Sequence, residues 1–193
     1  MDHNITVSGY YFELRPVRLD DAGFMISLRT DPELATYLNP TSDRLEDQQA
    51  YLENYFSRPD DYYFIVQDKA SGSPEGMLAI YDIDQRTQGA EWGRWILRKN
   101  SLAAVESACL VYRAGLEQLG LKELYCRTVA RNERVISFHA SCGLARARDL
   151  PAYVNIDGVS HDSVEQVMDS SSWQSCRQRL EEKARQIAIL LNR

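Results

Sequence analysis

The stretch Gly89-Ala-Glu-Trp-Gly-Arg-Trp-Ile-Leu-Arg-Lys-Asn-Ser-Leu-Ala-Ala-Val-Glu-Ser-Ala108 decides the fold, because it predicts a strand that passes through a short turn directly into a helix. Its first half contains the strand formers Trp92, Trp95, Ile96 and Leu97. Its second half opens a helical repeat of apolar residues, namely Leu102, Val105, Cys109, Tyr112, Leu116 and Leu119. We therefore expect a strand over residues 89–97 and a helix over residues 102–119.

The turn between these two elements, Arg98 to Ser101, has the features of an anion site. The first amides of a helix have no partners within the helix, and the helix dipole adds about half a positive charge at the same place. Arg98 and Lys99 add two full charges. The turn therefore predicts a bound anion, specifically a phosphate.

Composition and charge limit the class of protein. With 193 residues, 44% of them hydrophobic, the chain is expected to form a single domain over residues 1–193. The net charge of −6 argues against a nucleic-acid partner, since such proteins are usually basic. The first residues do not resemble a signal peptide, and no apolar run approaches the length of a membrane span.

The four cysteines at positions 109, 126, 142 and 176 have no paired spacing. Cys109 and Cys126 fall within an expected helix and an expected strand. We therefore predict buried, reduced thiols in a cytoplasmic protein, with neither a disulfide framework nor a metal site.

Elsewhere the chain alternates helices and strands, which indicates an α+β fold. Strands are expected at residues 10–18, 62–67, 76–83, 121–129, 152–156 and 163–168, in addition to 89–97. Helices are expected at residues 19–29, from a cap at Ser42 or Asp43 to 56, at 102–119 and 132–142, and at the C-terminus over about 172–192. The run of strands over 62–97 is expected to be antiparallel. Between the first two helices we expect a loop with Tyr37 and Leu38 exposed.

Two motifs carry a family resemblance. The run Arg98-Lys-Asn-Ser101-Leu-Ala103 keeps the spacing of a phosphate loop, R/Q-x-x-G-x-G/A. The run Asn132-Glu-Arg-Val-Ile-Ser-Phe-His139-Ala-Ser-Cys-Gly143-Leu follows N-x-x-x-I-x-x-Y-x-x-x-G-F. With this order of elements, the chain resembles the GNAT superfamily of acyl-CoA-dependent N-acetyltransferases over a core of about residues 10–173. The resemblance implies a mixed, mostly antiparallel central sheet flanked by helices, with an extra C-terminal helix, and acetyl-CoA as the acyl donor.

The resemblance also implies a set of residues that bind coenzyme A: Trp95, Ile96, Leu97, Arg98, Lys99, Asn100, Ser101, Leu102, Ala103, Asn132 and Arg134. Ser101 replaces the first glycine of the loop but keeps the backbone N–H expected to bind phosphate. If that position needs a positive φ, serine costs about 1–2 kcal/mol there. For Asn132 the alternative is a helix N-cap, and for Lys99 and Arg134 the alternative is an ordinary surface cation.

Two residues are the catalytic candidates. His139 stands where the family has a tyrosine that acts as general acid, and histidine with an ordinary pKa of about 6.5 can donate a proton near neutral pH. Its alternative is a histidine that packs with Phe138 or caps its helix. Glu91 is the expected general base, with a pKa raised by burial, unless its side chain points away from the site. Asp82 and Asp84 are the reserve candidates.

The acceptor is expected to be a small-molecule amine that contacts Tyr37, Asn39, Tyr153 and His161. The chain looks most similar to the branch that acetylates nucleotide-linked amino sugars in surface-glycan biosynthesis. The alternatives are the RimJ/RimL-like protein Nα-acetyltransferases, other small-amine acetyltransferases, and a non-catalytic acyl-CoA-binding or assembly module. The amphipathic last helix also suggests a homodimer.

Overall fold

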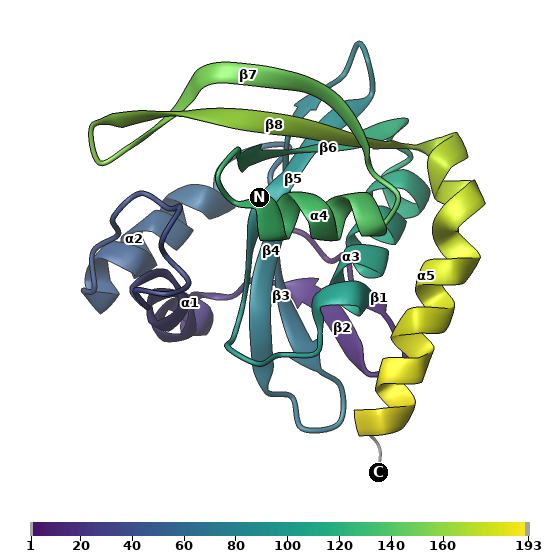
Figure 1. The fold of residues 1–193 in the computed structure, drawn as a ribbon. Coiled ribbons are helices and arrows are strands. Elements are labelled where there is room, and N and C mark those ends of the chain that lie inside the picture. The colour runs from purple at the N-terminus through teal and green to yellow at the C-terminus, as the bar shows by residue number, and fades with distance from the viewer. Residues whose placement is uncertain (1, 192–193) are drawn as a thin grey trace.

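An eight-stranded sheet forms the centre of the protein (Figure 1). The computed structural model describes residues 2–191. The strands are β1 (Val7–Ser8), β2 (Phe12–Pro16), β3 (Tyr62–Asp68), β4 (Pro74–Asp84), β5 (Gly89–Leu97), β6 (Glu123–Val129), β7 (Ala145–Ile156) and β8 (Val159–Asp169). Their order is β1-β2-β3-β4-β5-β6-β8-β7, in which β5 and β6 run parallel and the other neighbours antiparallel. The expected mixed, mostly antiparallel sheet is confirmed.

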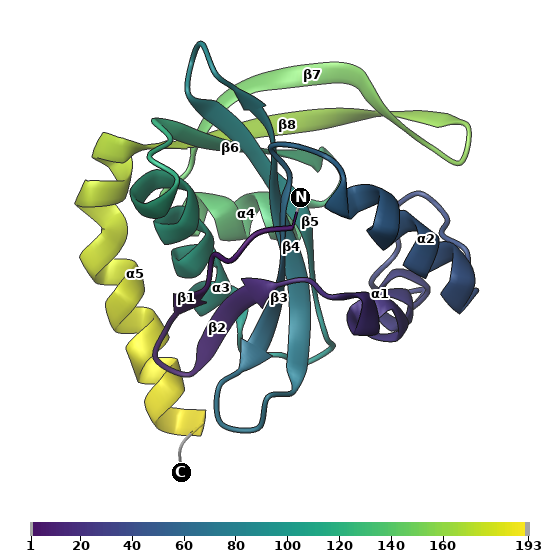
Figure 2. The ribbon, with the colours of Figure 1, turned by 180° about the vertical axis from the view of Figure 1, so that it is seen from behind.

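Helices cover both faces of this sheet (Figures 1 and 2). They are α1 (Ala22–Arg29), α2 (Leu45–Phe56), α3 (Ala104–Tyr112), α4 (Glu133–Ser141) and α5 (Ser170–Leu191). Because successive side chains of a strand point to opposite faces, β3 sends Tyr63 and Ile65 to the core under α1 and α2. It sends Phe64 and Val66 to the core under α3, α4 and α5. The functional groups can therefore be assigned to one face or the other.

Several element boundaries differ from expectation, and three of them are informative. The helix expected from Leu102 begins at Ala104, and Leu102 lies in the preceding turn with half of its surface exposed. The second helix begins at Leu45 rather than after a cap at Ser42 or Asp43, because the Ser42 hydroxyl instead donates to the Asp47 carboxylate. β7 begins at residue 145, well before the expected 152. Most of its side chains are exposed on both faces, so its sequence does not alternate.

The loop between α1 and α2 is also more packed than expected. Tyr37 and Leu38 are half-buried, and Leu38 contacts the core beneath α1 and α2. The four cysteines are buried and unpaired, as predicted. Among the described residues, no helix is long and apolar enough to cross a membrane.

The C-terminal helix α5 packs against its own domain. Its buried face includes Trp173, Cys176, Leu180 and Ala184, and it contacts α3 and β8. This face is therefore not available to a second copy of the chain. The homodimer stays a prediction, and it would need a different surface. Position 192, the expected end of the helix, lies outside the described residues.

The packing of α5 predicts effects of very different size for two leucines on the same helix. Leu180 is 1% exposed, whereas Leu190 is 62% exposed. Leu180→Ala should lower the free energy of unfolding by about 2–5 kcal/mol, because it removes buried methyl groups and leaves a cavity. Leu190→Ala should change it by about 0.5 kcal/mol or less. Urea denaturation measures both, and equal losses would contradict this docking of α5.

Candidate active site

The parallel strands β5 and β6 pair only at their beginnings. The paired residues run from Gly89 opposite Glu123 to Glu91 opposite Tyr125. Beyond Glu91, β5 continues to Leu97 paired with β4 alone, and β6 continues paired with β8 alone. The two strands therefore separate at Glu91, and the backbone groups of their facing edges are left open to a ligand.

A bulge reshapes β5 just after this point. Met77 and Ala79 of β4 are two residues apart, but they lie opposite Ile96 and Gly93, which are three apart. The extra residue falls beside Arg94, which has a φ of +50°. Such a bulge bends the strand and re-aims its side chains. It allows Arg94 to lie over side chains on the α1–α2 face of the sheet.

The turn after β5 differs in detail from the sequence-based prediction. Positive φ occurs at Asn100 (+62°), not at Ser101, so replacing glycine by serine at position 101 carries no left-handed strain. The backbone N–H of Ser101 donates to the Arg98 carbonyl at 3.1 Å, and its hydroxyl accepts from Ala103 N–H at 3.2 Å. Within α3, the amide of Ser107 bonds the Ala103 carbonyl, so the turn before it keeps the open amides of a helix start. These amides, rather than that of Ser101, are suited to an anion.

The cations expected around this turn are arranged unequally. Lys99 Nζ lies 3.0 Å from Asp31 and 3.2 Å from Glu33, so its charge is shared with the loop between α1 and α2. Arg98 and Arg134 are exposed, the latter on the first turn of α4. Arg98 has a long ion pair of 3.9 Å with Glu75, so Arg98 and Arg134 are held less tightly by carboxylates than Lys99 is.

Aromatic side chains lie between β5 and α4. The Trp95 ring stacks on Phe138 with centroids 5.0 Å apart, and its indole N–H donates to the Ser107 hydroxyl of α3 at 3.1 Å. Ile96 points the other way, into the core under α1 and α2. Asn132 occupies the N-cap position of α4, but its side chain makes no capping hydrogen bond. The alternative of a helix N-cap is therefore confirmed by position, without a side-chain hydrogen bond.

His139 is buried among these rings, with 3% of its surface exposed. Its Nδ1 lies 2.8 Å from the Cys126 sulfur, whereas no partner for its buried Nε2 is found among the described residues. Its ring centroid lies 5.0 Å from that of Trp92. Burial lowers the pKa of His139 to about 4, so the expectation of a histidine that titrates near neutrality is wrong. At pH 7 the ring is neutral, and one nitrogen carries a proton.

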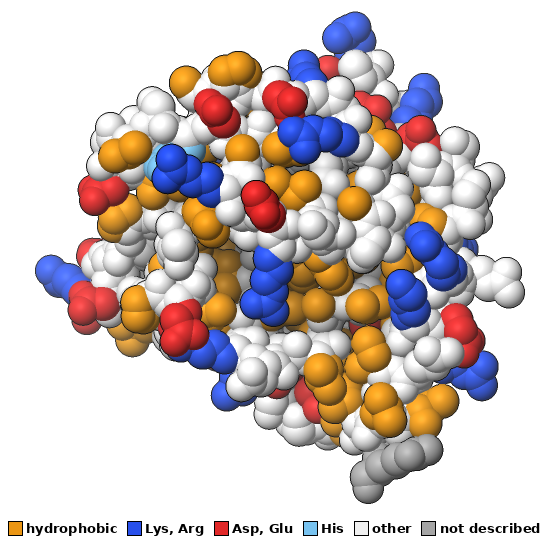
Figure 3. All heavy atoms as spheres, viewed as in Figure 1, with side chains coloured by type: hydrophobic (Ala, Val, Ile, Leu, Met, Phe, Trp, Pro, Cys, Tyr) orange, Lys and Arg blue, Asp and Glu red, His pale blue; other side chains and the backbone are white. Residues whose placement is uncertain are grey.

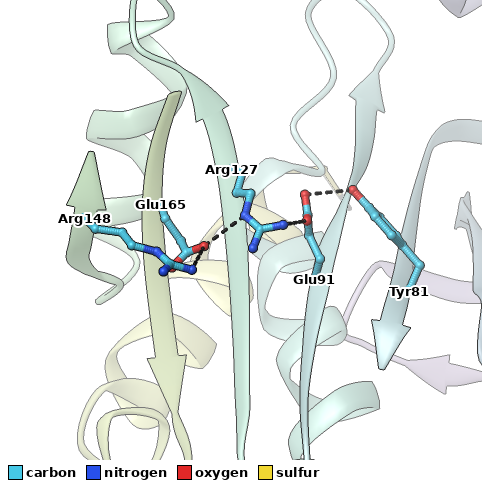
Figure 4. Close-up of polar contacts among 5 residues, drawn as sticks. All are labelled: Tyr81, Glu91, Arg127, Arg148 and Glu165. Atoms are coloured by element: carbon cyan, nitrogen blue, oxygen red, sulfur yellow. Dashed lines mark hydrogen bonds and ion pairs between the residues drawn. The ribbon is translucent and has the colours of Figure 1, made fainter. Parts of the chain in front are cut away.

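Glu91 belongs to a chain of polar side chains that crosses five strands, β4, β5, β6, β8 and β7, on the opposite face (Figure 4). The Tyr81 hydroxyl donates to Glu91 at 3.0 Å, and Arg127 Nη1 donates to its other oxygen at 2.8 Å. Arg127 Nε also donates to Glu165 at 2.9 Å, and Arg148 donates to the same carboxylate at 2.7 and 3.0 Å. Burial raises the pKa of Glu91 above its usual value, although Tyr81 and Arg127 act in the opposite direction. Glu91 is therefore buried and not a solvated strand residue, and its role as the base stays a prediction.

Of the four expected acceptor residues, Tyr153 contacts this chain of side chains, Tyr37 and Asn39 lie in the loop between α1 and α2, and His161 lies on β8. The Tyr37 hydroxyl donates to the Arg131 carbonyl at 3.2 Å, and the Asn39 side chain accepts from the amide of Asp157 in the β7–β8 turn. Arg127 lies 5.0 Å from the centre of the exposed Tyr153 ring. His161 is half-buried on β8, and it faces Val154 of β7 in the strand register.

Sequence reasoning missed Tyr81, Arg127, Glu165 and Cys126. Each lies on a strand, and a single sequence does not reveal which strands are neighbours. The one available signal was a set of charged or polar residues within otherwise buried strands, because such groups need partners.

On the molecular face shown in Figure 3, hydrophobic side chains gather near the middle, between the region of α1 and α2 and that of α3 and α5.

Comparisons with known proteins agree with this geometry. The family description "Acetyltransferase (GNAT) domain" matches residues 12–145. No curated protein sequence matches the chain. Among solved structures, apo FdhC, described as a nucleotide-linked sugar GNAT, is 28% identical with a TM-score of 0.78, covering 95% of this chain and 98% of that one.

Two further structures share the fold at lower identity. A putative acetyltransferase from T. thermophilus is 21% identical with a TM-score of 0.80, covering 95% of this chain and 98% of that one. Spermidine N-acetyltransferase from Vibrio cholerae, in complex with CoA and spermine, is 16% identical with a TM-score of 0.76, covering 85% of this chain and 98% of that one. Because the family match spans well over half of the chain, the protein belongs to the GNAT family of acetyltransferases and is an N-acetyltransferase that uses acetyl-CoA.

Proposed function

We propose that this enzyme acetylates a primary amine on a nucleotide-linked amino sugar, in surface-glycan biosynthesis. The observation that carries the reaction is the separation of β5 from β6 at Glu91, which brings an open strand edge beside a buried carboxylate. The similarity to FdhC over 95% of the chain supports the class of acceptor. The spermidine enzymes are only 15–17% identical, so their similarity supports the fold and not a polyamine acceptor.

The residues present fit the donor, acetyl-CoA. Its pantetheine arm carries amides, which suit the unpaired backbone groups of β5 at Trp95 and Leu97. Its phosphates suit the open amides at the start of α3, with Arg98 and Arg134 as the nearby cations. Acetyl-CoA supplies the activated acetyl group, and the protein supplies orientation, a base and a hydrogen-bond donor.

His139 is the proposed donor of a proton, through a hydrogen bond, to the departing thiolate. Burial raises the pKa of Cys126 well above its usual value, so its sulfur stays protonated and can donate to His139 Nδ1. The hydrogen of the neutral ring then resides on Nε2, which has no partner among the described residues. A buried donor without a partner costs about 1–3 kcal/mol, which is explained if its partner arrives with the substrate. From the neutral ring, Nε2–H donates a hydrogen bond that stabilises the developing thiolate. The ring keeps this proton, because losing it would leave an imidazolate, and the thiolate is neutralised by the proton that the attacking amine releases.

Glu91 is the proposed base that accepts a proton from the attacking amine. Its position at the last paired residue of β5 puts the carboxylate beside the strand separation. Because burial raises its pKa, the carboxylate is a better proton acceptor than a solvated one. Tyr81 and Arg127 each occupy one of its oxygens and fix its orientation.

An acceptor panel tests the proposed function. Purified protein with acetyl-CoA and a thiol reagent should release free thiol fastest with UDP- or dTDP-linked amino sugars, and more slowly with spermidine, N-terminal peptides or simple amines. A preference for peptides or polyamines would overturn the acceptor class. Binding of coenzyme A without thiol release from any amine would favour the non-catalytic alternative.

The proposed proton donor predicts a specific pattern among three variants. His139→Ala should lower kcat by about 10²-fold or more, the usual contribution of one hydrogen-bond donor to a developing negative charge. Cys126→Ala should also lower kcat, because the ring loses the partner that fixes its tautomer, whereas Cys126→Ser keeps a donor and should retain most activity. In all three, KM for acetyl-CoA should change little. Equal activity of the alanine and serine variants at Cys126 would contradict this role.

The proposed base predicts a pH dependence. Glu91 must be ionised to accept a proton, so kcat/KM should rise with pH through a pKa above the usual glutamate value. Glu91→Gln should lower kcat/KM by about 10²-fold and remove this rise of kcat/KM with pH, the acidic limb of the profile. Glu165→Gln is the matched control, because it also removes a carboxylate partner of Arg127 but should keep the limb. Loss of the limb in both variants would indicate that Arg127, and not Glu91, sets it.

A further inference from the structure

A cavity of about 420 Å³ lies between α1, α2 and the sheet. Its lining includes Arg29 at the end of α1, Gln48 on α2 and Arg94 at the bulge of β5. Thr41 lines it too, together with the exposed Asp47. A space of this size is sufficient for a small polar ligand.

Arg29 differs from the other arginine of the cavity. Arg94 is neutralised by Asp61, to which it donates two hydrogen bonds of 2.8 and 3.0 Å. Arg29 Nε donates to the Thr41 hydroxyl at 2.8 Å, and no carboxylate of the described residues 2–191 lies within ion-pair distance of its guanidinium. The positive charge of Arg29 is therefore not compensated by an ion pair on the wall of the cavity.

Gln48 is a second polar group in need of a partner. Its side chain is 6% exposed, and the contact of its amide nitrogen is the Met25 sulfur at 3.9 Å, a weak acceptor. Asp47 carries the opposite charge to Arg29, but it is exposed to solvent, where water screens its charge. The interior of the cavity is thus rich in hydrogen-bond donors.

The cavity is linked to Glu91 through a single tyrosine. The Arg94 guanidinium lies 4.4 Å from the centre of the Tyr81 ring, and the Tyr81 hydroxyl donates to Glu91 at 3.0 Å. Both sites therefore lie on the α1–α2 face of the sheet.

We propose that this cavity binds the phosphate or diphosphate ester of the acceptor, with Arg29 as the main anion-binding residue and Gln48 as a supporting donor. The fork of the guanidinium presents parallel N–H groups that match two phosphate oxygens. This inference rests on the proposed function and specifies the part of the acceptor that provides affinity. Arg29 is then a specificity-determining residue, distinct from the catalytic groups.

Calorimetric titration without acetyl-CoA tests the site directly. Uridine diphosphate, thymidine diphosphate and inorganic pyrophosphate are the probes, and they distinguish a nucleotide from a simple phosphate group. The native enzyme should bind at least one of them, Arg29→Ala should bind at least tenfold more weakly, and Arg29→Lys should be intermediate. Arg44→Ala is the matched control, because Arg44 lies on the same side of the protein but is 69% exposed and outside the cavity. Absence of binding, or equal weakening in the control, would overturn the site.

Kinetics separates this inference from the proposed function. Arg29→Ala should raise KM for a nucleotide-linked amino sugar about tenfold or more and leave KM for acetyl-CoA unchanged. If the native enzyme acetylates that acceptor and Arg29→Ala does so with an unchanged KM, the proposed function stands and the phosphate site is wrong. If Arg29 binds diphosphates but only amines without phosphate are acetylated, the site stands as an anion site and the proposed acceptor is wrong.

Discussion

The separation of β5 from β6 is the constraint on which the rest of the structure depends. Parallel strands normally pair along their whole shared length, but here the pairing ends at Glu91 opposite Tyr125. Arg127, two residues further along β6, reaches back to Glu91 and so joins the two strands on the α1–α2 face. On the other face the Trp95 and Phe138 rings lie beside the same opening. A side-chain hydrogen bond thus links β5 and β6 at the point where their backbone pairing ends.

The polar side chains beside this opening differ between the two faces of the sheet. On one face, Glu91 shares Arg127 with Glu165, and Arg148 provides a second guanidinium at Glu165. Removing one partner from such a group leaves an uncompensated buried charge, which is strongly unfavourable. On the other face, His139 is neutral and held by Cys126. The proposed base and the proposed donor to the thiolate therefore lie on the two faces of the sheet, beside the strand edge that the separation leaves open.

The sequence was sufficient to predict the fold but only part of the site. Long periodic segments, such as the strand and helix around Trp92 and Val105, follow from local pattern, as does the turn between them. Partners across strands do not, so the links of Glu91 to Tyr81 and Arg127 could not be derived. The pKa of His139 also depends on burial, which its helical position alone does not reveal. β7 was placed too late because its exposed side chains obscure the alternation.

Amide hydrogen exchange with and without coenzyme A tests the central claim most directly, since it reports on the backbone groups that the strand separation leaves open. Coenzyme A should slow exchange in residues 93–97 of β5 and 102–106 at the start of α3, and leave the amides of the β7–β8 hairpin nearly unchanged. If coenzyme A binds but exchange in residues 93–106 does not change, the open edge of β5 is not the donor site, and the account is wrong at its foundation.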